Sequence, residues 1–129
     1  MSNTRDGLIE EEVKCSCKGD NLDKFVQPLI LMLLSKQPLH GYRIIQELEG
    51  RKSFQEEKLD NAGVYRTLRT FEKRKKVTAV WDVHNSGAPK KIYQITEEGR
   101  ECLNHWIQTL EDYEKIIHAI LLEVRRDEV

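Results

Sequence analysis

Residues 61–99 contain a basic helix, a short strand, a turn and a second strand, in that order. In residues 61–76, apolar side chains recur at the spacing of one helical face, with basic side chains beside them. Residues 77–83 alternate with the period of two that is typical of a strand, the Asn-Ser-Gly sequence at 85–87 indicates a turn, and residues 92–95 return as the partner strand. This order predicts a winged helix-turn-helix, in which one helix enters a DNA groove and a two-stranded wing lies beside it.

Two further helices are predicted ahead of this segment. Pro28 suits the first turn of a helix, and the apolar run at 29–34 predicts a core helix that ends near Lys36. Residues 41–50 predict a second, shorter helix. Its expected inward side chains are Tyr42, Ile44, Ile45 and Leu48. The predicted fold is therefore mainly α with a small β-hairpin, in the α+β class.

The third helix is expected to carry its basic side chains away from its buried stripe. That stripe comprises Val64, Leu68 and Phe71. Either Asp60 or Asn61 can cap the helix. The whole chain has a net charge of −1, but residues 60–76 hold six basic and two acidic side chains, and phosphates respond to local charge. The candidate DNA-binding residues on this segment are Tyr65, Arg66, Arg69, Lys73, Arg74, Lys75 and Lys76.

Different roles are expected for these basic side chains. Arg66 and Arg69 are three residues apart and share a helical face, and arginine can read guanine edges with two hydrogen bonds. The basic run at 73–76 is expected to neutralise backbone phosphates without reading sequence. The wing adds Lys90 and Lys91, which alternate onto opposite faces of their strand, so one of them is expected to meet a phosphate.

A long amphipathic helix is predicted after the wing. Thr96 can cap it, with Glu97 and Glu98 in its first turn. Its apolar residues are separated alternately by three and four positions, which is an a/d seam over three heptads. The seam must be buried, either against a second copy in a twofold dimer or against the chain's own domain, and partial use of both is expected. The candidate dimer-interface residues are Leu103, Trp106, Leu110, Tyr113, Ile117, Ile120 and Val124.

Three blocks of this sequence resemble the PadR family of bacterial transcriptional regulators. They are the leucine-rich run at 29–34 with Pro-Leu-His-Gly-Tyr at 38–42, Gly-Val-Tyr-Arg-Thr-Leu-Arg at 63–69, and the stretch from Ser86 to Gly99. The resemblance covers about residues 28–100, and the last helix fits the branch with a single C-terminal helix. It implies a homodimeric winged helix-turn-helix, usually a repressor released from its operator by an effector. The matching turn residues His40, Gly41 and Tyr42 are interpreted as structural.

Two positions depart from the family pattern. The family usually has a glycine at the end of the recognition helix, where this chain has Lys75, and an apolar residue where it has Lys76. A left-handed cap on lysine costs about 1 kcal/mol relative to glycine, so the helix is expected to end differently here. Some relatives carry a ligand-stacking tryptophan at the position of Leu110, whereas Trp106 lies one turn earlier.

The sequence does not identify the effector or the residues that would bind it. Cys15 and Cys17 could join a soft-metal site or a redox switch, or they could be incidental cysteines in a flexible arm, because C-x-C alone is a common pattern. Trp106 could hold a small aromatic effector or simply fill the dimer core. Trp81, in the first wing strand, is expected to pack on the domain core. No metal ligands or cofactor are assigned.

Other classes of protein fit this sequence less well. It contains no Ser/His/Asp arrangement, paired acids, phosphate-binding loop or H-E-x-x-H motif, so no enzyme is predicted. The longest apolar run, at 29–34, is far below the roughly 20 residues that cross a bilayer, and no secretory signal is recognisable, so a cytoplasmic protein without a membrane partner is expected. The rival hypothesis is a protein-interaction module that does not bind DNA. The expected domains are a flexible polar arm at 1–20, the winged helix-turn-helix at 21–96 and the dimerisation helix at 97–129.

Overall fold

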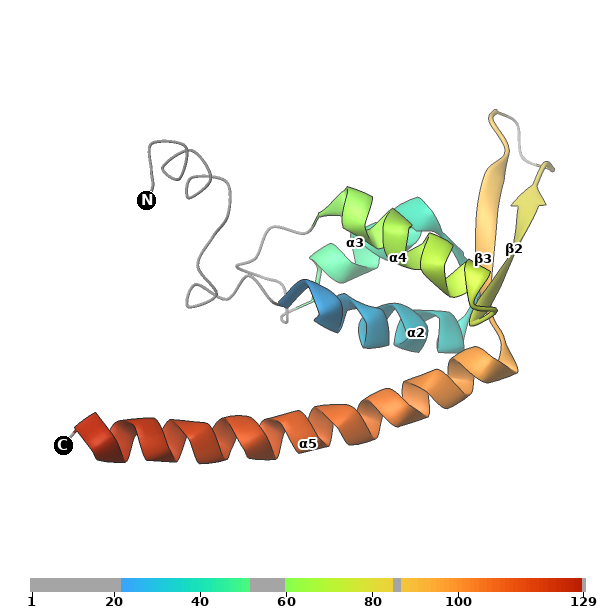
Figure 1. Cartoon of the computed structure of the whole chain (residues 1–129). Coiled ribbons are helices and arrows are strands. Elements are labelled where there is room, and N and C mark those ends of the chain that lie inside the picture. Colours follow the sequence, from blue (N-terminus) through green and yellow to red (C-terminus); the bar gives the residue numbers. More distant parts are fainter. Residues whose placement is uncertain (1–21, 52–59, 85–86, 129) are drawn as a thin grey trace, which may run out of the picture.

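The computed structural model describes residues 22–51, 60–84 and 87–128 of the 129-residue chain (Figure 1). Its elements are η2 (Leu22–Phe25), α2 (Val26–Lys36), β1 (Leu39–His40), α3 (Gly41–Glu49), α4 (Asn61–Lys73), β2 (Val77–Asp82), β3 (Lys90–Ile95) and α5 (Glu97–Glu128). The predicted α+β class is confirmed, because helices dominate and one small antiparallel sheet accompanies them. Within the described ranges, no helix is long and apolar enough to cross a membrane.

The core lies between α2, α3 and α4. Five of its side chains, Ile30, Leu31, Ile44, Leu48 and Leu68, are fully buried, and each of the three helices contributes at least one of them. Burial of a large aliphatic side chain stabilises the folded state by about 1.5–3 kcal/mol relative to exposure. These contacts therefore hold the two helix-turn-helix elements, α3 and α4, on α2.

One of the expected inward side chains of α3 is not buried. Tyr42 is 62% exposed, whereas Ile44, Ile45 and Leu48 are in the core as predicted. Successive helical residues are rotated by about 100°, and the buried stripe continues through Gly41 instead of Tyr42. The prediction was wrong because a tyrosine next to an apolar stripe was counted as part of it.

The sheet has three strands in the order β1-β3-β2, all antiparallel. The wing hairpin of β2 and β3 was predicted, but β1 was not. Leu39 and His40 of β1 pair with Tyr93 and Ile92 of β3. Two residues are too few to show the period of a strand, so no sequence pattern could indicate β1. This short pairing connects the wing directly to the turn that precedes α3.

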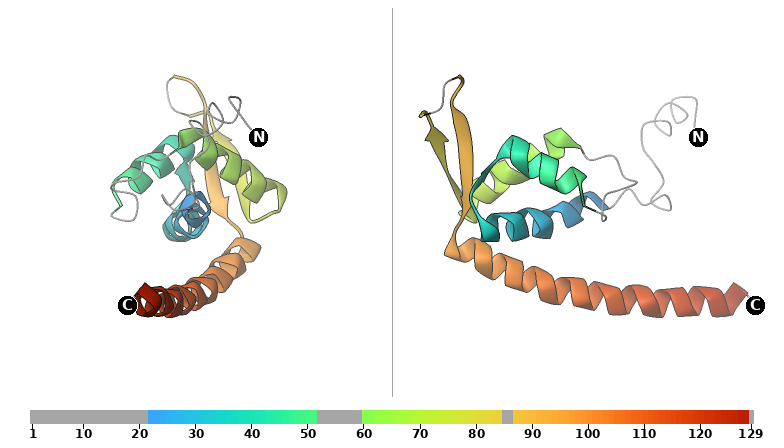
Figure 2. Two further views of the ribbon diagram at one scale, coloured as in Figure 1. Left: turned by 60° about the vertical axis from the view of Figure 1, so that its left-hand side comes forward. Right: turned by 180° about the vertical axis from the view of Figure 1, so that it is seen from behind.

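The outer part of the wing extends beyond the core. The hairpin projects past the helices in both Figure 1 and Figure 2. Along β2, Val77 is buried, Ala79 is partly buried and Trp81 is 62% exposed, although all three share one face. The expectation that Trp81 packs on the core is therefore wrong, because the strand leaves the core before it reaches this residue.

The end of α4 takes the conformation that the sequence argued against. Lys75 has a positive φ of 63°, which L side chains seldom adopt. The N–H of Lys76 donates to the carbonyl of Phe71 at 2.8 Å, and the N–H of Lys75 donates to the carbonyl of Glu72 at 3.1 Å. This pair of bonds is the Schellman motif, which usually has glycine at the left-handed position. The helix thus ends as in the family pattern, with lysine in place of glycine.

The turn after α4 is bonded to the start of α5. Thr96 caps α5 as predicted, because its Oγ1 accepts a hydrogen bond from the N–H of Gly99 at 3.0 Å. The same hydroxyl lies 2.7 Å from the carbonyl oxygen of Lys75 and 2.9 Å from that of Lys76, so its proton is shared between them. A Cβ on Gly99 would collide with the Lys76 carbonyl. We call this contact between Lys75, Lys76, Thr96 and Gly99 the α4–α5 junction.

Helix α5 starts under the sheet and runs along α2, on the side opposite α4 (Figures 1 and 2). Leu103 and Trp106 near its start pack against the core. Its C-terminal part continues past α2 and carries side chains such as Ile117, Ile120 and Val124 that are more than half exposed. Helix α4 and the exposed part of α5 therefore lie on opposite sides of the molecule.

The positive φ of Lys75 predicts that one substitution at this position will stabilise the folded protein. We expect Lys75→Gly to raise the free energy of unfolding by about 1 kcal/mol, because glycine adopts a positive φ without a steric penalty. Lys73→Gly removes the same charge from the last helical turn and is expected to lower it by about 0.5 kcal/mol. Urea unfolding followed by circular dichroism measures both. A Lys75→Gly protein no more stable than wild type would contradict the prediction.

Candidate nucleic-acid interface

The surface formed by α4 and the wing contains the predicted DNA-binding residues. On α4, the predicted stripe of Val64, Leu68 and Phe71 is buried. Arg66 and Arg69 are exposed, away from this stripe, as expected. The Arg66 side chain makes an ion pair with Asp60 at 3.4 Å, and both side chains are more than 60% exposed. An exposed pair of this kind contributes little to stability, so Arg66 can exchange Asp60 for another acceptor at low cost.

The same ion pair changes the role expected for Asp60. Asp60 occupies the N-cap position of α4 with extended backbone angles, but its side chain makes no capping hydrogen bond. Its carboxylate is directed to Arg66 instead. The start of α4 is thus positioned without the side-chain cap that the sequence predicted.

Tyr65 joins α4 to the start of α3. A Cβ added to Gly41 would collide with the Tyr65 ring, so the ring lies directly on the backbone of that glycine. Tyr65 is still 38% exposed. The Gly41 position, interpreted as structural from the sequence, therefore lets the recognition helix approach α3 closely while part of the tyrosine stays on the surface.

The two wing lysines have different surroundings. Lys91 Nζ lies 3.0 Å from Glu72 Oε1 of α4 and 5.6 Å from the centre of the Tyr93 ring. Lys90 is exposed. The strand alternation was correct in separating them: Lys91 points toward α4, and Lys90 is the lysine that remains open to solvent. No sequence pattern indicated the Glu72–Lys91 ion pair, because the partners are 19 residues apart on different elements.

The charges around Tyr93 indicate how close α4 and the wing are. Burial raises the pKa of the Tyr93 phenol, while the nearby positive charges of Lys91 and Arg69 oppose this change. The phenol is therefore neutral at physiological pH and adds no negative charge beside Lys91 and Arg69. Arg69 is the α4 arginine that lies toward the wing.

A group of basic residues follows at the end of α4. Lys73, Arg74 and Lys75 are exposed and Lys76 is partly buried. Within residues 22–51, 60–84 and 87–128, none of these four makes an ion pair. The Schellman turn directs their backbone around the end of the helix, so their charges gather next to the base of the wing.

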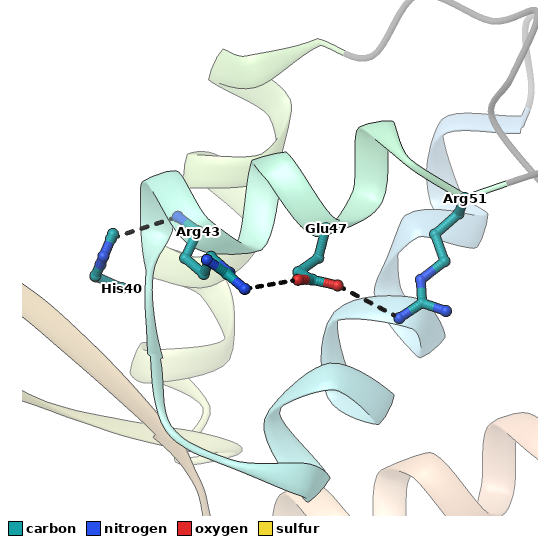
Figure 3. Close-up of polar contacts among 4 residues, drawn as sticks. All are labelled: His40, Arg43, Glu47 and Arg51. Atoms are coloured by element: carbon teal, nitrogen blue, oxygen red, sulfur yellow. Dashed lines mark hydrogen bonds and ion pairs between the residues drawn. The ribbon is translucent and has the colours of Figure 1, made fainter.

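A network of charged side chains runs along α3 and includes Arg51 just after it (Figure 3). Glu47 pairs with Arg43 at 3.2 Å and with Arg51 at 3.7 Å. The i, i+4 spacing of these three residues was a signal that the sequence reading passed over. At the start of the helix, His40 Nδ1 accepts a hydrogen bond from the N–H of Arg43 at 3.3 Å, so His40 is a helix cap.

The predicted dimer-interface residues divide into two groups. Leu103 and Trp106 are partly buried against the core of their own chain. Phe25, which the sequence reading missed, has its ring centre 6.5 Å from that of Trp106, edge to face, and 6.1 Å from that of Tyr113. The remaining residues are Leu110, Tyr113, Ile117, Ile120 and Val124, and their side chains are exposed. Intramolecular packing therefore uses the first part of the seam and leaves the rest uncovered.

The two candidate effector cysteines, Cys15 and Cys17, lie outside the described residues. Cys102 is described and is a partly buried free thiol. In the described ranges, no group of His, Cys, Asp and Glu side chains could hold a metal ion. The other effector candidate, Trp106, lies in the aromatic cluster with Phe25 and Tyr113.

Comparisons with solved structures find this arrangement in several microbial proteins. A candidate transcriptional regulator from Thermoplasma acidophilum is 27% identical, with a TM-score of 0.66 over 78% of this chain and 93% of that chain. A PadR family transcription regulator from Clostridium difficile R20291 is 24% identical, with a TM-score of 0.64 over 75% and 98%. These proteins share the fold over nearly their whole length. No curated protein matches this sequence significantly.

A third solved structure is Bacillus subtilis PadR in complex with operator DNA. It is 24% identical, with a TM-score of 0.55, and the match covers 64% of this chain and 46% of that chain. The model of the transcriptional regulator PadR-like family matches residues 30–105, from the core of α2 into the start of α5. This match covers more than half of the sequence and includes the helix-turn-helix, the wing and the α4–α5 junction. The chain belongs to the PadR-like family of transcriptional regulators.

Proposed function

We propose that this protein is a dimeric, sequence-specific DNA-binding regulator, acting as a repressor that an effector releases from its operator. The observation that carries the proposal is the surface of α4 and the wing: Arg66 and Arg69 are exposed on α4, which lies on the opposite side of α2 from α5, and the basic residues after α4 lie next to the base of the wing. Such a surface can meet the phosphates of a duplex while α5 remains available for another contact.

Each part of this surface suits a different part of the duplex. Helix α4 enters the major groove, where Arg66 and Arg69 can donate to guanine edges. Lys73, Arg74 and Lys75 face the phosphates at the groove edge and supply affinity that depends on salt. Lys90, in the wing, reaches the phosphates of the adjacent minor groove. Bacillus subtilis PadR supports this assignment, because its structure was solved in complex with operator DNA and shares its fold with 64% of this chain.

The exposed part of α5 supports the dimer. A monomer would leave Leu110, Ile117, Ile120 and Val124 in water along one helix, and a second copy can cover this a/d seam with its own. The twofold axis then relates two α4 helices, which enter successive major grooves about 34 Å apart. The operator would accordingly be a palindrome with one helical turn between its half-sites.

The effector would act on the same helix. The cluster of Phe25, Trp106 and Tyr113 joins α5 to the start of α2, so a planar aromatic ligand inserted there would change the angle between them. Thiol chemistry or metal binding at Cys15 and Cys17 is the alternative input. In either case, a small rotation of α5 misaligns one recognition helix with its groove.

The DNA-binding proposal is tested with duplexes that the purified protein selects from a random pool. We expect Arg66→Gln and Arg69→Gln to weaken binding to a selected palindrome by about 1–3 kcal/mol each and to relax the base preference at their positions. Lys73→Gln and Arg74→Gln should weaken binding to every sequence and lower the salt slope by about 1 each. Fluorescence anisotropy at several salt concentrations measures both effects.

Lys115→Gln is the matched control, because Lys115 is an exposed lysine on α5, away from α4. It should bind as wild type does. If the wild-type protein selects no duplex and binds none in a salt-dependent way, the DNA-binding proposal fails, and a protein-interaction module becomes the better explanation of the exposed seam.

The dimer proposal predicts that substitutions within the seam of α5 change the oligomeric state. We expect Ile117→Glu and Ile120→Glu, which place charges within the seam, to convert the dimer to a monomer at micromolar concentration. Lys115→Glu introduces the same side chain off the seam and should leave the dimer intact. Sedimentation equilibrium measures the masses. A wild-type protein that is monomeric at the same concentration would contradict the proposal.

The two effector hypotheses give separable outcomes. If the thiols are the input, oxidation or zinc should release DNA from the wild-type protein and not from a protein with Cys15→Ser and Cys17→Ser. If the aromatic cluster is the input, planar aromatic compounds should quench Trp106 fluorescence and release DNA, and Trp106→Leu should abolish that release. Operator affinity that is unchanged by all of these treatments would contradict both.

A further inference from the structure

The wing carries a large aromatic side chain that the fold leaves uncovered. Outside α5, the described large apolar side chains that are exposed are Tyr42, Tyr65, Val80, Trp81 and Val83. Three of these five belong to the first wing strand or directly follow it. Trp81 is the largest of them, and its burial in a contact could contribute more binding energy than that of any other wing residue.

The strand register fixes the face on which Trp81 lies. Trp81 is directly opposite Lys91 across the hairpin, and opposed residues of antiparallel strands share a face. Lys91 bonds to Glu72 of α4 at 3.0 Å, so this face of the wing turns toward the recognition helix. Val80, the neighbouring residue, alternates to the opposite face and is also 62% exposed. Trp81 therefore lies beside the Glu72–Lys91 ion pair, at the angle between α4 and the wing.

This angle is where a DNA strand would cross from one groove to the next. If α4 is in the major groove and the wing tip is at the adjacent minor groove, the sugar-phosphate backbone between the two grooves passes between them. On the α4 side of this angle, the exposed Arg69 and Lys73 can complement its phosphates, whereas Lys90 lies on the other face of the wing. The deoxyribose rings of the same strand present apolar surface between those phosphates.

We propose that Trp81 packs on a deoxyribose of the strand that separates the two grooves, and so fixes the wing against the minor-groove edge. The inference rests on the proposed DNA binding and adds a contact that makes no hydrogen bond to a base and carries no charge. Trp81 would thus increase affinity for any duplex by the same factor and contribute neither base preference nor counterion release.

Replacement of Trp81 tests this proposal through three readouts together. We expect Trp81→Ala to weaken binding about tenfold, both to a selected palindrome and to a scrambled duplex of equal length, with the salt slope unchanged. Trp81→Phe should recover part of the loss, because a smaller ring still packs on the sugar. Val80→Ala, at an equally exposed position on the other face, should bind as wild type does. Fluorescence anisotropy measures the affinities, and thermal unfolding verifies that each variant is folded.

Fluorescence of Trp81 itself provides a second, independent measurement. The chain has two tryptophans, so a Trp106→Phe protein reports from Trp81 alone. We expect its emission to shift to shorter wavelength or to be quenched when a duplex is added, and to stay constant when the protein is diluted without DNA.

Several outcomes would overturn the inference. One is a Trp81→Ala protein that binds both duplexes as wild type does, while Arg66→Gln and Arg69→Gln still weaken binding. Another is a lower salt slope or an altered base preference in Trp81→Ala, because an apolar sugar contact produces neither. A third is a Trp81 signal that follows protein concentration without DNA, because the ring would then face a second copy of the chain. If the wild-type protein binds no duplex at all, the proposed function itself fails.

Discussion

The hydrogen bonds at the α4–α5 junction determine how the functional parts of this protein are oriented. The Thr96 hydroxyl contacts the carbonyls of Lys75 and Lys76 and also caps α5, so one side chain joins the end of the recognition helix to the start of the terminal helix. Gly99 permits this contact because any side chain there would collide with the Lys76 carbonyl. Since β2 begins at Val77, the junction also sets the direction of the wing.

The wing is connected to the helices at a second place. The Glu72–Lys91 ion pair joins α4 to β3, and the short β1 pairs with the same strand. Both groups of the ion pair are about one-third exposed, which limits its contribution to stability. Its main effect is geometric, because it holds the wing at a defined angle to α4. The exposed Trp81 on the wing and the basic residues of α4 are thereby held at a fixed position relative to each other.

Most of the fold could be predicted from the sequence because it depends on local periodicity. The stripe of Val64, Leu68 and Phe71, the alternation from Val77 and the Thr96 cap each follow from spacing within a few residues, and the structure confirms them. The family was also recognisable, because three blocks occur in the correct order. These patterns required no knowledge of how distant parts of the chain meet.

The features that were missed depend on contacts between distant residues. The Glu72–Lys91 pair, the two-residue β1 and the packing of Phe25 on Trp106 join separate elements, and no local pattern indicates them. The placement of Trp81 failed for a related reason: alternation gives the face of a strand but not the point at which the strand leaves the core. At Lys75, the expectation that the helix ends differently was wrong: the residue adopts the left-handed conformation, and the two Schellman hydrogen bonds form around it.

The length of α5 has a mechanical consequence. Its 32 residues extend over about 48 Å at the usual rise per residue, and its contacts with the DNA-binding domain extend from its start to Tyr113, about halfway along the helix. If the whole helix turned as a lever about the junction, a rotation of about 5° would move its far end by about 4 Å. Conversely, displacements of a few ångströms at the far end produce only a slight rotation of α4. The effector proposed at Trp106 would act in the first half of the helix and have the larger angular effect for a given displacement, whereas the exposed distal part of α5 would suit the proposed contact between two copies.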